Sequence, residues 1–250
     1  NYVAWQWKAG TSFTNDASGT SIGSIDSAGS VNTDAGFSIV SFTSTGSTST
    51  VAHALGVKPD LYIIKKRAGD GGWFTFFTIV DGSLDYLLLH NTNAKVDVSL
   101  SAPTSTVFST DNGSSGETMI AYCFAEKQGY SKIGSYKGNG NADGTFVYTG
   151  FKPAFVMIKI TDNASQDWFV LDNKRSPFNL VDDSLAPNQS DAEYTSEANL
   201  DFLSNGFKLK MTSIRVNGSG NNYIYMAFAE NPFVTSTGVP TTARWWLEKK

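Results

Sequence analysis

One phrase occurs twice in this chain, and no other feature of the sequence restricts the fold as much. Residues 56–66 read GVKPDLYIIKK and residues 150–160 read GFKPAFVMIKI. In both copies Gly-x-Lys-Pro precedes a run of apolar and aromatic residues, and a Lys follows at the same step. Self-similarity over a long spacing indicates a duplicated structural unit. We therefore expect two copies of one module.

Other features recur in the same order around this phrase. A Gly-aromatic-Ser sequence opens each unit, a Trp-Phe pair follows the repeated phrase, and an Asn-Gly-Ser turn leads to a closing apolar strand. We expect unit 1 over residues 36–128, unit 2 over 129–233 and a C-terminal tail over 234–250. The matched landmarks are Gly36 and Gly129, Trp73 and Trp168, 112–114 and 217–219, and the closing strands 119–126 and 223–230.

The first residues resemble the two closing strands. Tyr2–Trp7 reads YVAWQW, with bulky residues at matching places. Residues 1–35 are therefore expected to hold the last strand of a preceding unit and then, over 10–35, a connection rich in Ser, Thr and Gly. A strand without its own unit is predicted to pair with a later unit or with a neighbouring subunit by strand addition. On this interpretation the chain is part of something longer.

The remaining segments indicate an all-β fold. Each unit contains short runs of β-branched and aromatic residues bounded by Gly, Asn, Asp and Ser, which is typical of strands and turns. Several runs are apolar at nearly every position, which favours strands covered on both faces. Turn residues arrive at the spacing of a β-sandwich. We predict tandem, jelly-roll-like β-sandwich repeats, with 182–203 as a long loop containing at most one helical turn.

The repeated phrase is predicted to start a strand. Gly56 and Gly150 suit a turn, and Pro59 and Pro153 suit a strand entrance where no ladder donor is needed. Because the preceding Lys is pushed into the extended region by its Pro, the whole phrase is interpreted as a loop-to-strand junction. A binding role for Lys58 and Lys152 is the alternative.

Composition argues against several classes of partner. The net charge is −4 and the compact basic stretch is only Lys65–Arg67, so no nucleic-acid partner is expected. The single cysteine, Cys123, allows no disulfide within the chain and is predicted to be a buried core residue. The sequence has no apolar run of the length that crosses a membrane, so no membrane insertion is expected.

Catalytic residue patterns are sparse. The two histidines, His53 and His90, have no counterparts in the repeat, so we interpret both as structural or solvated. Paired carboxylates could hydrolyse a glycoside at the right separation, but the acids lie in polar, loop-like stretches. We predict that the chain is not an enzyme. The carboxylates considered are Asp81, Asp85, Asp172, Asp182, Asp183, Glu193 and Glu197.

A calcium loop is a second possibility. The stretch KGNGNADGT places Asn139, Asn141 and Asp143 among glycines. It contains one carboxylate and lacks the spacing and terminal Glu of an EF-hand. A polar hairpin loop is the favoured interpretation, and we predict no metal or cofactor.

The aromatic residues suggest one binding chemistry. A sugar binds by stacking on an exposed Trp or Tyr flanked by Asn and Asp. Trp73 and Trp168 are the best candidates, because each stands at a loop edge and they match across the repeat. Packing within the core or between the units is the favoured alternative for both rings.

Five phrases of the chain resemble a domain found in structural proteins of tailed bacteriophages, many from marine and cyanobacterial hosts. In those proteins the domain often follows a lectin-like sandwich in fibres or appendages. The resemblance covers about Tyr2 to Arg244, is strongest over 119–162, and brings no catalytic motif. The phrases are VAWQWKAG, NTDAGFSIVSF, HALGVKPDLYIIKKR, MIAYCFAEKQGYSKIGSYKGNGNADGTFVYTGFKPAFVMIKITD and AFAENPFVTSTGVPTTAR.

The resemblance implies a component of the virion surface. The expected function is a non-catalytic structural or appendage protein that contributes to fibre assembly and host attachment, as a homo-oligomer with other virion proteins. The alternative is a carbohydrate-binding module for cell-surface glycans, with Trp73 and Trp168 on its sugar face.

Overall fold

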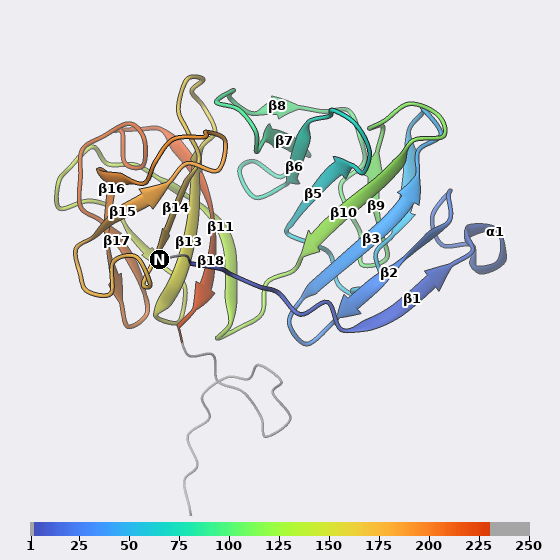
Figure 1. Ribbon diagram of the computed structural model, residues 1–250, viewed down its shortest axis with the longest axis horizontal. Coiled ribbons are helices and arrows are strands. Elements are labelled where there is room, and N and C mark those ends of the chain that lie inside the picture. The colour runs from blue at the N-terminus through green and yellow to red at the C-terminus, as the bar shows by residue number, and fades with distance from the viewer. Residues whose placement is uncertain (1–2, 231–250) are drawn as a thin grey trace, which may run out of the picture.

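A computed structural model describes residues 3–230 and confirms the all-β prediction. Two eight-stranded antiparallel sheets lie side by side, one for each unit (Figure 1). In the first sheet the strand order is β1-β2-β3-β10-β5-β6-β7-β8, and β4 and β9 pair as a separate small sheet. The strands of this half are β1 (Thr11–Asn15), β2 (Ser27–Asn32), β3 (Phe37–Thr43), β4 (Ser49–Ala52), β5 (Leu61–Lys66), β6 (Trp73–Phe77), β7 (Asp85–Leu88), β8 (Val96–Asp97), β9 (Val107–Thr110) and β10 (Thr118–Phe124).

The second sheet belongs to unit 2 and has the order β11-β18-β13-β14-β15-β16-β17-β12. Its first six strands repeat the order β3-β10-β5-β6-β7-β8 of the first sheet, position by position. The sheet is nearly closed and barrel-like. The strands are β11 (Ser131–Lys137), β12 (Phe146–Tyr148), β13 (Pro153–Ile160), β14 (Phe169–Asp172), β15 (Val181–Leu185), β16 (Tyr194–Leu203), β17 (Gly206–Leu209) and β18 (Asn222–Ala229).

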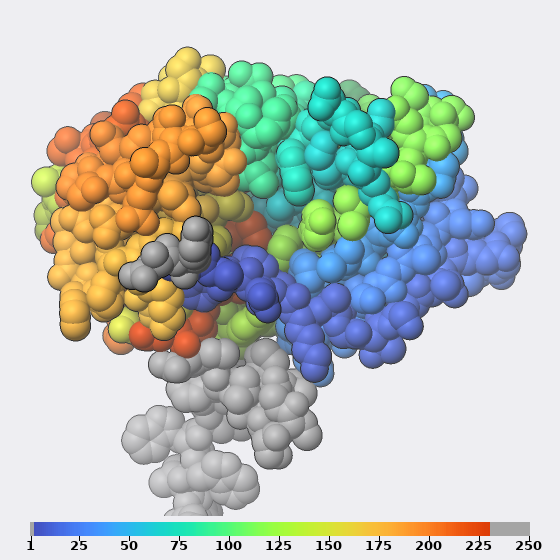
Figure 2. All heavy atoms as spheres, in the orientation of Figure 1, coloured from blue at the N-terminus to red at the C-terminus, as the bar shows by residue number. Residues whose placement is uncertain are grey.

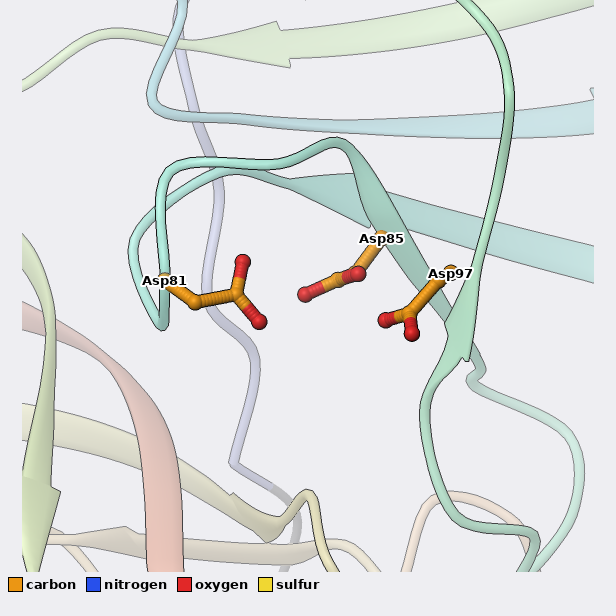
Figure 3. A group of neighbouring side chains, drawn as sticks. All are labelled: Asp81, Asp85 and Asp97. Atoms are coloured by element: carbon orange, nitrogen blue, oxygen red, sulfur yellow. The ribbon is translucent and has the colours of Figure 1, made fainter.

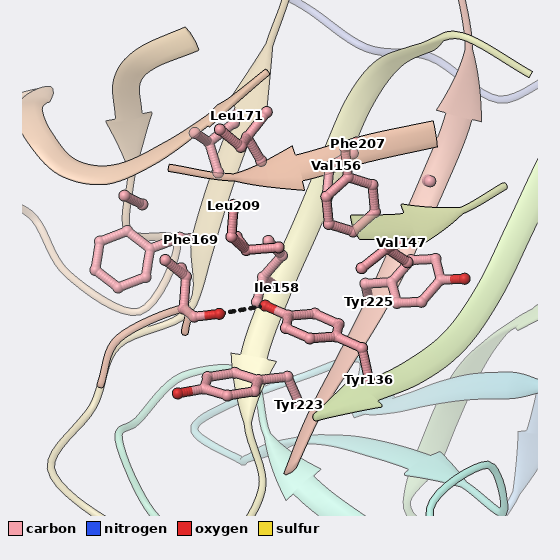
Figure 4. Packing of buried hydrophobic residues seen from close by; sticks show 14 of the residues in the cluster. Tyr136, Val147, Val156, Ile158, Phe169, Leu171, Phe207, Leu209, Tyr223 and Tyr225 are labelled. Atoms are coloured by element: carbon pink, nitrogen blue, oxygen red, sulfur yellow. Dashed lines mark hydrogen bonds between the residues drawn. The ribbon is translucent and has the colours of Figure 1, made fainter. Parts of the chain in front are cut away.

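Each unit has a hydrophobic core of its own. In unit 2 all eight strands contribute side chains to one cluster (Figure 4). Tyr136 and Tyr223 stack in parallel there, with ring centroids 4.9 Å apart, and the Tyr136 hydroxyl donates to the Val216 carbonyl at 2.6 Å. In unit 1, Val51 and Phe108 of the β4–β9 pair cover the outer face of the first sheet.

A third cluster lies between the two units, and we call it the seam core. It joins β3, β5, β6, β7 and β10 of unit 1 to β11, β13 and β18 of unit 2. Because apolar burial stabilises by about 25 cal/mol per Å² of apolar surface, this cluster holds the units together. Its buried members are Phe37, Leu61, Ile63, Phe77, Leu87, Phe124, Ile133, Phe155, Met157, Trp168, Ile224, Met226 and Phe228.

Strand β13 shows why some runs of the sequence are apolar at every position. All eight of its residues are buried. Phe155 and Met157 point into the seam core, whereas Val156 and Ile158 point into the unit 2 core. The predicted strand covered on both faces is therefore confirmed at this position.

The repeated phrase takes the predicted position in both units. Gly56 and Gly150 have φ angles of +73° and +84°, which residues with a Cβ atom rarely adopt. β5 begins two residues after Pro59, and β13 begins at Pro153 itself. The interpretation of the phrase as a loop-to-strand junction is thus confirmed.

Over the described part, residues 3–7, the predicted N-terminal strand does not pair within the chain, and its pairing with a neighbouring subunit stays a prediction. This segment joins no sheet, although its exposure alternates as in a strand, with Trp5 and Trp7 turned inward. Trp7 packs edge-on against Phe124, Phe155 and Phe228, so it bridges the two units. The segment is anchored by side chains and not by a backbone ladder.

Two other segments are more ordered than predicted. Residues 10–35 are not an irregular connection, because they form β1, the short helix α1 (Ala17–Thr20) and β2. Residues 182–203 are not a loop, because they contain most of β15 and all of β16. In β16 the buried residues Ala198, Leu200 and Phe202 alternate with polar ones, a period-2 pattern within a polar stretch.

Candidate binding site

An aromatic groove surrounds the first predicted site residue, Trp73. Trp73 begins β6 and is partly buried. Its ring lies nearly parallel to Tyr122, at 6.4 Å between centroids and 16° between planes, and Lys65 Nζ lies 5.8 Å from the ring centroid. Trp5 and Trp7 line the same hollow of about 490 Å³. The aromatic groove therefore presents several ring surfaces in one place.

His90 accepts a hydrogen bond from the backbone of Trp73 at this groove. The Trp73 N–H donates to His90 Nδ1 at 3.0 Å, and His90 itself is exposed. The sequence placed His90 at a strand end without a partner, because the contact is made across the β6–β7 hairpin. β6 and β7 were both predicted as strands, so their pairing could have revealed this neighbour.

Trp168 occupies a different environment, and its predicted sugar-binding role is corrected. Its side chain is 1% exposed and lies in the seam core. The indole Nε1 donates to the Leu88 carbonyl of unit 1 at 3.0 Å. A buried ring offers no free face to a sugar, so Trp168 packs the two units together.

The lysines of the two repeated phrases also differ in burial, as Trp73 and Trp168 do. Lys65 and Lys159 occupy the same step of the repeated phrase. Lys65 Nζ donates to the Gly71 carbonyl at the groove, whereas Lys159 is fully buried and donates to the Ile160 carbonyl at 3.1 Å. Burial lowers the pKa of Lys159 to about 8, because the charged form loses its hydration, and the charge of Asp167 opposes this shift.

A group of three carboxylates lies at one end of unit 1. Asp81, Asp85 and Asp97 each place an oxygen within 4.8 Å of the other two (Figure 3). Oxygen ligands in such a group are those that Ca²⁺ and Mg²⁺ prefer. Lys95 Nζ lies 3.1 Å from Asp81 Oδ2, 3.1 Å from Asp85 Oδ2, and in contact with Asp97. The ammonium therefore stands among the oxygens that a metal ion would need.

Asp85 is the buried member of this group. Burial raises its pKa to about 6, with a further contribution from its hydrogen bond to Asp97, while Lys95 opposes the shift. The hydrogen bonds to Lys95 and Asp85 lower the pKa of the exposed Asp97. Two acids with separated pKa values are a requirement for acid–base chemistry, but here one ammonium contacts both.

Three of the other candidate carboxylates, Asp172, Glu193 and Glu197, are also paired with cations. The buried Asp172 contacts Arg175, whose Nε lies 2.9 Å from Glu193. Glu197 is paired with Arg215. Asp183 accepts a hydrogen bond from Ser176, and Asp182 is half-buried in β15.

In the predicted calcium loop, side-chain oxygens accept hydrogen bonds from backbone N–H groups of the same loop. Asn139 Oδ1 accepts from the Asn141 N–H, and Asn141 Oδ1 accepts from the Asp143 N–H. Lys208 Nζ lies 2.5 Å from Asp143. These contacts favour the polar hairpin loop.

His53 and Cys123 are buried, as the structural interpretations predicted. His53 Nδ1 accepts from the Leu55 N–H, and Nε2 lies 3.2 Å from the Thr104 carbonyl. Desolvation lowers the pKa of His53. Burial raises the pKa of Cys123 to about 12, so this thiol stays protonated and unreactive at neutral pH.

Lys58 and Lys152 of the repeated phrase have separate partners. Lys58 Nζ donates to the Thr78 hydroxyl at 2.8 Å, whereas Lys152 pairs with Glu230 at 2.8 Å. They share no surface contact that would form one binding site. Over residues 3–230 the structure has no helix with the length and apolar character to cross a membrane.

Comparison with known proteins gives a family and no function. No curated protein matches the chain, and no solved structure matches it. One family matches residues 1–232, and its description is Domain of unknown function (DUF7483). Because this match covers nearly the whole chain, the protein belongs to the DUF7483 family.

Proposed function

We propose that this chain is a non-catalytic structural module of a tailed-bacteriophage virion appendage, where it contributes to fibre assembly and host attachment. The proposal combines the sequence resemblance with one observation of the structure, the seam core. That core joins two sheets face to face into one body, and Trp168 adds a hydrogen bond across the junction. A rigid pair of packed sheets suits a load-bearing surface protein.

We propose further that the two units are copies of one β-sandwich module. The matching strand order over six strands supports this, as do the two loop-to-strand junctions. Duplication lengthens a scaffold without a new fold, which is useful in an appendage.

A homo-oligomer is part of the proposal. β1 is the edge strand of the first sheet and has the uncharged sequence TSFTN. Uncharged edge strands offer free backbone groups for pairing with another chain. Pairing of β1 with a second copy would continue the sheet across the subunits.

The carboxylates support the non-catalytic part of the proposal. Asp85 and Asp172 are the buried candidates, and each is neutralised by a cation of its own unit, Lys95 and Arg175 respectively. A glycosidase needs one carboxylic acid and one carboxylate facing the same bond. The ion pairs leave neither buried acid free for that role.

The assembly state tests the structural function. Light scattering coupled to size-exclusion chromatography should show a stable oligomer of the 250-residue chain at micromolar concentration. Replacing Phe13 in β1 by Pro, which removes a backbone donor, should convert it to monomer. A chain that is monomeric at every concentration contradicts the proposal.

Carbohydrate binding is the second candidate, and the aromatic groove favours it. Trp73 and Tyr122 lie nearly parallel beside each other at its edge, as a sugar-stacking surface requires. Trp168 no longer contributes, so this function rests on unit 1 alone.

A further inference from the structure

The first sheet has an open face that unit 2 does not cover. β1 and β2 widen this sheet beyond β3, whereas over residues 3–230 the second sheet has no added strands outside β11. On β3, Phe37 is buried in the seam core, while Ile39 and Ser41 farther along the same face are half-buried. Figure 2 shows this face, hollowed above the N-terminal segment.

Three hollows join along the open face, and we call them together the long groove. The aromatic groove shares Ile39 with a middle hollow of about 320 Å³. The middle hollow shares Ala28, Ser41 and Arg67 with a third hollow of about 780 Å³. The long groove crosses strands from β6 to β2, so at about 4.8 Å per strand its length is roughly 20 Å.

The two ends of the long groove differ in chemistry. One end is aromatic, with Trp73 and Tyr122. The other end is lined by the hydroxyls of Thr14, Thr43 and Thr118, which make no hydrogen bond within the described chain. Rings beside free hydroxyls match a ligand that has apolar ring faces and many hydroxyl groups. An apolar peptide would leave the polar end without partners.

Arg67 stands between these ends. Its side chain is exposed and, over residues 3–230, makes no ion pair, while its backbone N–H donates to the Thr118 carbonyl. Thr118 pairs with Thr43 across β10 and β3, and both residues line the same hollow as Arg67. A free guanidinium with adjacent donors is suited to a carboxylate, which it binds in a bidentate manner.

The acids at the polar end are already engaged. Asp16 Oδ1 accepts from the Gly19 N–H and the Ser18 hydroxyl, and Asp26 Oδ1 accepts from the Ala17 N–H. Both carboxylates therefore accept hydrogen bonds from residues of α1. Arg67 is the charged residue of the middle hollow, and over residues 3–230 it makes no ion pair.

We propose that the long groove binds a linear acidic polysaccharide, with sugar rings on Trp73 and Tyr122 and a carboxylate of the chain on Arg67. This inference rests on carbohydrate binding, the second candidate function. It adds the ligand class, the length of the site and the residue that selects for charge.

Calorimetric titration of the intact chain tests the proposal. The probes are hexasaccharides of mannuronic acid and of mannose with the same linkage, because they differ only in the carboxylate, plus uronate-containing and sulfated hexasaccharides of other backbones. Saturable binding is expected for at least one acidic chain, with the matched neutral chain at least tenfold weaker. Trp73→Ala and Arg67→Ala should each weaken binding about tenfold, and Arg67→Ala should remove the preference for the acidic chain.

Two variants in unit 2 are matched controls. Phe178→Ala removes an exposed aromatic ring and Lys174→Ala an exposed cation, and both should bind as the wild type does. Circular dichroism melting establishes that each variant is folded. Failure of every acidic chain to bind overturns the proposal, as does equal affinity for neutral and acidic chains. An oligomer that assembles but binds no saccharide removes the groove proposal and leaves the structural function in place.

Discussion

The two units place the same pair of residues in opposite environments. Lys65 and Trp73 of unit 1 border an open groove, whereas Lys159 and Trp168 of unit 2 are buried at the junction. The strand order around them is the same in both units. A shared strand order therefore does not give a shared site, because the surroundings of each unit decide what its side chains contact.

The added strands explain the difference. β1 and β2 extend the first sheet past the area that unit 2 covers, and the second sheet instead continues through β17 and β12 in its nearly closed form. Unit 1 thus keeps part of its sheet face free beyond the seam core. Substitutions at matched positions, such as Trp73 and Trp168, distinguish a residue at the open groove from a residue that packs the two units together.

Trp168→Ala should have the largest effect on stability. It removes a buried indole from the seam core together with its hydrogen bond to Leu88, so the free energy of unfolding should fall by about 3–5 kcal/mol. Urea unfolding monitored by circular dichroism measures this. A loss below about 1 kcal/mol would contradict the role of Trp168 at the junction.

Lys95→Met should be the next largest change. It leaves Asp85 buried without its cation, and about 3 kcal/mol should be lost at pH 7. The loss should shrink as the pH falls, because burial raises the pKa of Asp85 and, without Lys95 to oppose this shift, the carboxyl becomes neutral more readily. Urea unfolding at pH 5 and pH 7 checks both parts, with Lys174→Met as the exposed control. A loss that does not depend on pH argues against the Asp85 explanation.

Lys159→Met should be neutral or stabilising, by about 1 kcal/mol at pH 7, since it replaces a buried ammonium with an apolar chain. The folded pKa of about 8 lies below the ordinary 10.5, so the unfolded chain binds more protons between these values. Wild-type stability should therefore rise with pH in this range, and the advantage of the variant should decrease. Unfolding at pH 7 and pH 10 measures the difference. An advantage that grows with pH would show that the sign is wrong.

Trp73→Ala should have the smallest effect on stability, about 1 kcal/mol or less, because the ring is only partly buried. The comparison with Trp168→Ala is made under the same urea conditions. Equal losses at the two positions would remove the distinction between the units.

Much of the fold could be predicted from the sequence. The repeated phrase, its glycines and prolines, and runs such as FSIVSFT locate strands correctly because local chemistry determines them. The segment 182–203 was missed because polar residues on one face hide the buried Ala198, Leu200 and Phe202. Residues 3–7 form no strand within the chain, because an alternating pattern does not say whether backbone or side chains make the contacts.

The site was less predictable, for a physical reason. Trp73 and Trp168 have similar local sequences, and only the packing of one unit on the other buries the second ring. Thr43 ends β3, Thr118 begins β10 and Arg67 directly follows β5, so these residues meet only when the sheet forms. Residues that meet across a sheet are far apart in the sequence, so no local sequence pattern predicts their contact.

Fluorine NMR of the chain labelled with 5-fluorotryptophan tests the contrast between the units most directly. Single Trp→Phe variants assign the resonances, and a soluble paramagnetic agent reports which rings face solvent. The account predicts strong broadening for Trp73 and none for Trp168, with the Trp73 resonance, and not the Trp168 resonance, shifting when an acidic hexasaccharide is added. Equal broadening of the two resonances, or a saccharide-induced shift at Trp168, would contradict it.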